Sequence, residues 1–264
     1  MTAVADQPAT VDPIPRTPVL RWWKEAIYIA VFYGIYTIIR DTQGSHAVSS
    51  ARALANAKQV VSSERALGIF HEQAIQHAFL SQHLFLRFWG AFYGSAHFVV
   101  TVGALIWLFR GMLERYPLWR NTLAITTALA LIGFAAYPLM PPRLLPGGYH
   151  FVDTLKTVGG LWSFDSGAMQ KVSNQYAAMP SLHFAWSSWC AFVLWPALRR
   201  KWSRALALAY PFATLFAIVV TANHFFLDAA GGAVALAMGL VVSLEVTRRF
   251  AKRQRAVGVV APTG

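Results

Sequence analysis

Six apolar runs, each about as long as a membrane-spanning helix, constrain the fold of this chain more than any other feature. A helix needs roughly 20 apolar residues to cross the hydrocarbon core of a bilayer, and its backbone groups must bond one another there because no water is present. The pattern predicts an all-α polytopic membrane protein, a bundle of six transmembrane helices. The runs are Trp23–Ile39, Phe88–Phe109, Asn121–Met140, Leu182–Leu198, Ala205–Thr221 and Phe225–Val246.

Composition supports the membrane class and excludes others. The 264 residues are 56% hydrophobic and 13% charged, which is too little charge to cover a soluble protein of this length. A net charge of +12 could indicate nucleic-acid binding, but the basic residues lie in short loops and at the C-terminus, without an aromatic platform or binding motif. We therefore expect no nucleic-acid partner. Cys190, the single cysteine, can form neither an internal disulfide nor a zinc site, and we expect it to be a small core residue.

The distribution of positive charge predicts the orientation. Most of the 23 Lys and Arg residues fall in the N-terminal tail, in the loops after the second and fourth runs, and in the C-terminal tail. Because cytoplasmic segments carry the excess of basic residues, both termini are expected to be cytoplasmic. The segments after the first, third and fifth runs are then extracytoplasmic, and the expected location is the cell membrane.

The chain divides into a tail, one membrane domain and a second tail. Residues 1–21 are polar and Pro-rich and predict a disordered cytoplasmic tail, residues 22–250 form a six-helix catalytic domain, and residues 251–264 are a basic cytoplasmic tail. Within the domain, residues 41–86 scatter apolar positions among charges, which predicts one or two interfacial helices in the first outer loop. Residues 144–179 contain two Gly-Gly pairs and predict an irregular lid or active-site loop.

Three polar stretches interrupt the apolar chain: Tyr137–Arg143, Met179–His183 and Asn223–Asp228. Ionisable residues at membrane depth are costly, so they are candidates for function. In the orientation predicted from the loops, all three stretches emerge on the extracytoplasmic face. The charge of the loops is independent of these stretches, so their convergence on one face supports both predictions.

His224 and Asp228 are four residues apart, a spacing that places both on one face of a helix. A carboxylate that accepts a hydrogen bond from one imidazole nitrogen fixes the tautomer and leaves the other nitrogen free to attack. The alternative is a helix-end pair that only serves packing. Because Asp228 opens an uncharged apolar stretch, where an idle carboxylate would be expensive, we favour a catalytic pair.

His183 follows Pro180-Ser181 at the start of the fourth run. Proline suits the first turn of a helix, and the free amides there can bind anionic oxygens. A protonated His183 could act as a general acid, or it could be an interfacial histidine. Ser181 could donate to a phosphoryl oxygen or could cap the helix, and the sequence leaves both open.

Arg143 follows two prolines, and its planar guanidinium suits two phosphoryl oxygens. Its alternative role is to extend toward the interface. Lys171 and Lys156 lie in the same outer loop and could add positive charge; of the two we select Lys171 for the phosphate site. His97, within the second run, either faces a cavity or, as we favour, hydrogen-bonds between helices. The cluster 229–232, Ala-Ala-Gly-Gly, suits close helix packing.

Together these stretches resemble the type 2 phosphatidic acid phosphatase superfamily, over roughly residues 23 to 247. That family carries the signatures K-x6-R-P, P-S-G-H and S-R-x5-H-x3-D. Residues 180–183, Pro-Ser-Leu-His, match the second with Leu in place of Gly, and His224 and Asp228 match the end of the third. The resemblance implies that His224 is the nucleophile, Asp228 its orienting carboxylate and His183 the acid.

The chain departs from the family signatures at the basic positions. Ala217 and Ile218 stand where Ser-Arg would precede His224, and Arg143 is followed by Leu144, with no lysine seven residues before it. Phosphate binding would then depend more on Arg143, on Lys171 and on the amides of the fourth run. The Pro-Pro-Arg and Met-Pro-Ser-Leu-His forms look closer to the branch that includes fungal inositol phosphorylceramide synthase.

The expected function is that of an integral-membrane phosphatase or phosphotransferase acting through a phosphohistidine on a phospholipid or prenyl phosphate. Its expected partners are this lipid phosphate, the membrane lipids and, if an alcohol replaces water as acceptor, a polyol; no metal and no cofactor is expected. The rival class is a non-catalytic lipid-binding or transport protein. Against it, no second set of intramembrane charges forms a path to the cytoplasm, and no inverted repeat is present.

Overall fold

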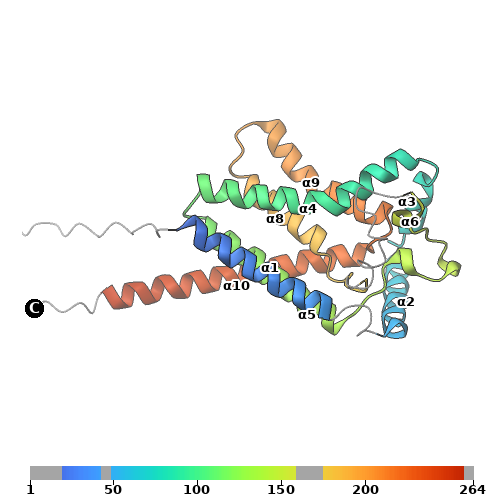
Figure 1. Ribbon diagram of the computed structural model, residues 1–264, viewed down its shortest axis with the longest axis horizontal. Coiled ribbons are helices and arrows are strands. Elements are labelled where there is room, and N and C mark those ends of the chain that lie inside the picture. The colour runs from blue at the N-terminus through green and yellow to red at the C-terminus, as the bar shows by residue number, and fades with distance from the viewer. Residues whose placement is uncertain (1–19, 43–48, 159–174, 259–264) are drawn as a thin grey trace, which may run out of the picture.

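The computed structural model describes residues 20–42, 49–158 and 175–258, and its regular elements in these ranges are helices (Figure 1). The long helices are α1 (Trp22–Thr42), α4 (His83–Gly111), α5 (Tyr116–Ala136), α9 (Lys201–Val220) and α10 (Phe226–Gly258). The short elements are α2 (Ser50–Ala66), α3 (Glu72–Phe79), α6 (Thr154–Thr157), α8 (Leu182–Leu194) and the 3-10 turns η1 (Pro142–Leu144) and η2 (Gly147–Tyr149). The all-α prediction is confirmed for the part of the chain that the structure describes.

Four helices are long and apolar enough to cross a membrane: α4, α5, α9 and residues Phe226–Phe250 of α10. They expose large apolar side chains, among them Val99, Ile132, Phe212 and Val241. Extended apolar exposure is unusual on a soluble monomer but suits contact with lipid tails. These helices therefore support the prediction of a membrane protein.

The predicted count of six spans is not confirmed, because α1 and α8 are not among these four helices. Charged residues near both ends of α1, such as Lys24 and Glu25 at its start, lower its mean hydropathy. Helix α8 has 13 residues instead of the predicted run Leu182–Leu198, so it is about 20 Å long, shorter than a bilayer core of about 30 Å. It lies at the centre of the bundle with Trp189 and Cys190 fully buried, which confirms Cys190 as a core residue.

Between α1 and α4, the described residues form two short helices, α2 and α3, in agreement with the one or two helices predicted there; their location at a membrane interface stays a prediction. Both lie, together with α6, at one end of the long helices, whereas α1 begins and α10 ends at the opposite end (Figure 1). One face of α2 is buried through Ala53, Ala57 and Val60 against a cluster that includes Leu139 and Phe225. These helices therefore cover the end of the bundle at which α10 begins.

The segment that leads into α8 is held tightly between α5 and α10. A Cβ at Gly133 would overlap the ring of Pro180, and a Cβ at Gly232 would overlap the carbonyl oxygen of Ser181. Glycine is therefore required at both positions. The Ser181 amide also donates to the main-chain oxygen of Asp228 at 2.8 Å. This packing fixes the start of α8 against the start of α10 and agrees with the packing role predicted for residues 229–232.

Candidate active site

His224 and Asp228 form a hydrogen-bonded pair, hereafter the His–Asp pair, at the start of α10. The His224 Nδ1–H donates to Asp228 Oδ2 at 3.2 Å, and the imidazole and carboxylate are 5% and 0% exposed. The same Oδ2 accepts from the Phe225 amide at 3.0 Å, so Asp228 also caps its own helix. Because Nδ1 carries the proton, Nε2 of His224 has a free lone pair, as a nucleophile requires.

A tight turn between α9 and α10 carries His224 into place. Ala222 has φ 54°, a left-handed conformation that is strained for a residue with a side chain. The amides of Asn223 and His224 both donate to the carbonyl oxygen of Ile218, at 2.9 Å and 3.2 Å. The Asn223 side chain donates to Thr221 Oγ1 at 2.8 Å. The turn is thus fixed by hydrogen bonds on both sides of the strained residue.

His183, at the first turn of α8, lies beside His224, with 5.5 Å between the two ring centroids. Ser181 precedes α8 and its side chain accepts from the Phe184 amide, so of the two roles left open, capping is the one the structure contains. Two histidines from helices that follow different apolar runs therefore meet at one point. Their separation allows both rings to reach a single phosphoryl group.

Two ring side chains of α4 complete the surroundings of His183. Tyr93 stacks on it with 4.3 Å between centroids, and the ring of His97 lies equally close at 4.3 Å. His97 Nδ1 lies 3.0 Å from the Tyr93 carbonyl oxygen, to which it can donate within α4. The hydrogen bond between helices that the sequence favoured for His97 is wrong: the bond lies within α4, and the ring faces His183.

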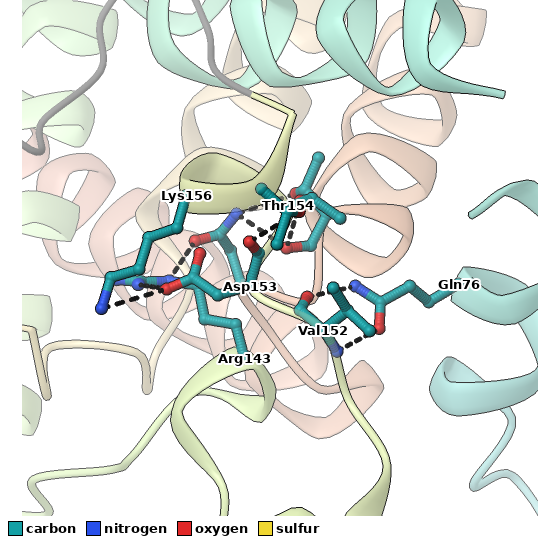
Figure 2. Close-up of polar contacts among 9 residues, drawn as sticks. Gln76, Arg143, Val152, Asp153, Thr154 and Lys156 are labelled. Atoms are coloured by element: carbon teal, nitrogen blue, oxygen red, sulfur yellow. Dashed lines mark hydrogen bonds and ion pairs between the residues drawn. The ribbon is translucent and has the colours of Figure 1, made fainter. Parts of the chain in front are cut away.

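Arg143 lies in η1, where it joins the turn before α10 to α6 (Figure 2). Its main-chain amide donates to the Ala222 oxygen at 2.8 Å, and its Nε donates to Asn223 Oδ1 at 3.0 Å. Its Nη1 donates to Asp153 Oδ2 at 3.1 Å, and Lys156 Nζ lies 4.0 Å from the same oxygen. The guanidinium is thus bound directly to the residue that precedes His224.

The segment that carries Asp153 is anchored to α3. Figure 2 shows the Gln76 side chain paired with the main chain of Val152: Gln76 Nε2 donates to the Val152 oxygen at 2.8 Å and Oε1 accepts from the amide at 3.0 Å. Thr154 Oγ1 donates to the Thr221 oxygen at 3.4 Å. Lys156, which the sequence ranked below Lys171, is the lysine found beside Arg143. Lys171 lies outside the described residues, as do residues 159–174 of the predicted lid.

Tyr137, at the end of α5, faces the same end of the bundle. Its hydroxyl donates to the Asn56 oxygen and to Gln59 Oε1, each at 3.2 Å. Burial and, secondarily, the negative charge of Asp228 raise the pKa of this phenol, which therefore stays protonated at neutral pH.

Among the described residues, no group of three His, Cys, Asp or Glu side chains could hold a metal ion.

Comparison with known families agrees with this geometry. The chain matches the family model described as PAP2 superfamily over residues 58–242, well over half of its length. The chain belongs to the PAP2 superfamily. Members are generally phosphatases, which supports an enzyme with phosphatase- or phosphotransferase-type activity. No curated protein and no solved structure shows significant similarity to it.

This PAP2 protein lacks the arginine of the family's Ser-Arg signature. Ala217 and Ile218 are fully buried in α9, and Ile218 packs in an apolar cluster with Val219 and Ala229. No arginine side chain reaches the site from those positions. Arg143, bound to Asn223, is the cation that the described residues bring next to the turn that carries His224.

Several residues of the site were missed from the sequence. Tyr93, Asn223 and Asp153 belong to no signature used above, although Asn223 lies inside a polar stretch. Glu64 and Glu72 are fully buried and bind the first turn of α10, yet they lie in a segment predicted only as interfacial. Helical periodicity is the signal that could have found Glu64, because it follows Val60 and Val61 on the buried face of α2.

Proposed function

We propose that this PAP2 protein is a lipid phosphate phosphatase or phosphotransferase that acts through a phosphohistidine at His224. The observation that carries the proposal is the 5.5 Å approach of the His183 and His224 rings, with Asp228 bound to the far nitrogen of His224. This arrangement offers a nucleophile and an acid on two sides of one phosphorus atom.

The first half-reaction transfers the phosphoryl group to the enzyme. His224 Nε2 forms a bond to phosphorus while the bond from phosphorus to the lipid oxygen breaks, and protonated His183 gives its proton to that oxygen. Asp228 stabilises the positive charge that develops on the His224 ring. The lipid alcohol leaves and the phosphohistidine remains.

The second half-reaction returns the phosphoryl group to an acceptor. Neutral His183 removes a proton from the acceptor, whose oxygen attacks phosphorus while the bond to His224 Nε2 breaks. With water the product is inorganic phosphate, and with an alcohol it is a new phosphoester. Arg143 and the free amides of the first turn of α8 stabilise the phosphoryl oxygens, because catalysis of this transfer depends on positioning and electrostatics.

The substrate class follows from the surroundings. Apolar, lipid-facing helices surround the bundle, which supports a phospholipid or prenyl phosphate rather than a free sugar phosphate. The charge pattern of the loops supports cytoplasmic termini and an extracytoplasmic site, in the cell membrane.

An alcohol acceptor is the second candidate, in the manner of inositol phosphorylceramide synthase. The Pro-Pro-Arg form at 141–143 and the Met-Pro-Ser-Leu-His form at 179–183 favour it. Purified enzyme supplied with a lipid phosphate, with and without inositol, distinguishes the candidates. A phosphatase releases phosphate in both conditions, whereas a transferase needs the polyol and forms a phosphoester.

The central test is His224→Ala in the full-length protein, assayed with phosphatidate and a polyprenyl phosphate. We expect turnover to be abolished while the circular dichroism spectrum is retained, and His183→Ala to be strongly impaired. His83→Ala, at an exposed position at the start of α4, is the matched control and should keep wild-type turnover. Wild-type turnover in His224→Ala would refute His224 as the nucleophile, whereas a wild-type protein that binds these lipid phosphates without turning them over would favour the non-catalytic lipid-binding role.

A further inference from the structure

The first turn of α10 is capped by two glutamates that are distant in the sequence. Glu72 Oε1 of α3 accepts from the Phe226 amide at 2.9 Å, and Glu64 Oε1 of α2 accepts from the Leu227 amide at 2.8 Å. The first amides of a helix have no acceptor within the helix, and carboxylates suit the positive end of its dipole. Both glutamates are 0% exposed, so this cap is wholly internal.

The two carboxyl groups bind consecutive amides of one turn, so they lie close together. The Oε2 atoms of both are buried and have no hydrogen-bond partner in the described part of the chain. A single proton held between the two Oε2 atoms would give each of them a partner. Burial and such a hydrogen bond to Glu72, aided by the negative charges of Glu72 and Asp228, raise the pKa of Glu64 to about 9. Glu64 therefore holds a proton at neutral pH, which can lie between the two Oε2 atoms.

We propose that Glu64 and Glu72 are positioning residues, a proton-sharing carboxyl pair that fixes the first turn of α10 and, through it, the His–Asp pair. This inference rests on the proposed function. Phe226 and Leu227, whose amides the glutamates bind, lie between His224 and Asp228 in the sequence, so any movement of this turn changes the direction of the imidazole. Two buried carboxyl groups are an expensive way to fill a core, and apolar residues would pack there at lower cost.

The shared proton also limits the charge near the nucleophile. The titratable groups that face Glu64 are Glu72 of α3 and Asp228 of α10. If the pair loses its proton, a second negative charge appears close to Asp228. Carboxylates that repel one another no longer hold the first turn of α10 in place, so kcat should fall as the pair deprotonates.

Glutamine substitutions test the shared proton directly. In Glu64→Gln or Glu72→Gln, the amide oxygen can still accept from the α10 amide, and the NH2 group can replace the shared proton. In the double variant two NH2 groups face each other and neither finds an acceptor. We expect each single variant to lose less than about tenfold in kcat, and the double variant to lose roughly tenfold more than the product of the single losses.

The pH profile separates positioning from simple support of the fold. Wild-type kcat should fall above a pH of about 9, where Glu64 deprotonates, and Glu64→Gln should lack this alkaline loss. Profiles are taken where circular dichroism shows folded protein. Glu245→Gln is the matched control, since this half-exposed residue pairs with Arg249 far along α10, and its profile should match the wild type.

Two results would overturn the inference. One is a kcat loss in the double variant equal to the product of the two single losses, and the other is a fall of kcat at alkaline pH in Glu64→Gln that matches the wild type. If the wild type turns over no lipid phosphate, the proposed function fails. The pair is still tested by the unfolding temperatures of the wild type, Glu64→Gln, Glu72→Gln and the double variant. Strongly non-additive unfolding temperatures support the pair, and additive ones refute it. Non-additive unfolding temperatures combined with additive kcat losses would make the pair structural only, which also refutes a positioning role.

Discussion

Two sides of the candidate site differ in burial and in the elements that carry them. The nucleophile side, as proposed above, is His224 with Asp228; it is almost fully buried and is held by hydrogen bonds within the start of α10 and to the end of α9. The phosphate side, Arg143 with Asp153 and Lys156, lies on a 3-10 turn and a four-residue helix, and the Lys156 side chain is half exposed. The proposed catalytic pair is thus carried by the buried start of a long helix, whereas the proposed phosphate-binding residues are carried by short elements that reach further into solvent.

Charge differs between the two sides as well. On the nucleophile side a carboxylate supports the reacting group, because Asp228 holds the proton of His224 Nδ1. On the phosphate side a carboxylate opposes substrate binding, because Asp153 accepts a hydrogen bond from Arg143 and would compete with a phosphoryl oxygen for it. Removing one negative charge should therefore have opposite effects on the two sides.

The largest effect is expected from Asp228→Asn. The amide cannot accept the His224 proton with equal strength and favours the wrong tautomer, so kcat should fall by about 10²- to 10⁴-fold. Steady-state kinetics with a lipid phosphate measures this loss. Less than a fivefold change would mean that the buried carboxylate does not orient the nucleophile.

A smaller effect is expected from Arg143→Lys. Lysine keeps the charge but cannot donate to Asn223 and Asp153 from one planar group. We expect kcat/KM to fall by about 10- to 100-fold, with unchanged helix content. Arg249→Lys, at an exposed position far along α10, is the matched control and should behave as the wild type. Equal kinetics in the two variants would remove Arg143 from the phosphate site.

Gly232→Ala tests the contact that joins the two histidine-bearing helices. The added Cβ would overlap the Ser181 carbonyl oxygen, so α8 and α10 must separate. We expect a loss of about 1–3 kcal/mol in the free energy of unfolding, with a parallel loss of activity. Gly103→Ala, where nothing lies within 4 Å of the new Cβ, should be neutral or slightly stabilising. Similar unfolding curves for the two variants would contradict the close packing.

The smallest effect is expected from Asp153→Asn. Loss of the carboxylate leaves the charge of Arg143 available to substrate, so KM should fall up to about fivefold, the range of a partly exposed ion pair. A titration of initial rate against lipid phosphate measures it. A rise in KM would mean that Asp153 orients Arg143 for binding instead of competing with the substrate.

Local features of the sequence predicted the His–Asp pair and the four long apolar helices, because spacing along one helix and length of an apolar run are visible without tertiary contacts. The end of α8 at Leu194 was not predicted, because the apolar run continues to Leu198; the signal for it is Pro196, which has no amide hydrogen with which to continue the helix. The residues that bind the first turn of α10 could not be predicted from the sequence. Glu64 and Glu72 approach it only when α2 and α3 pack onto the end of the bundle, a contact over more than 150 residues of sequence.

Trapping of the phosphorylated enzyme tests the central claim most directly. Full-length protein is mixed with ³²P-labelled lipid phosphate, quenched within the first turnover and analysed under alkaline conditions, in which phosphohistidine survives. We predict label on the wild-type chain in an acid-labile, base-stable form that maps to His224, and none on His224→Ala. Turnover of the lipid without any labelled protein, or label that persists in His224→Ala, would contradict a phosphohistidine at the start of α10.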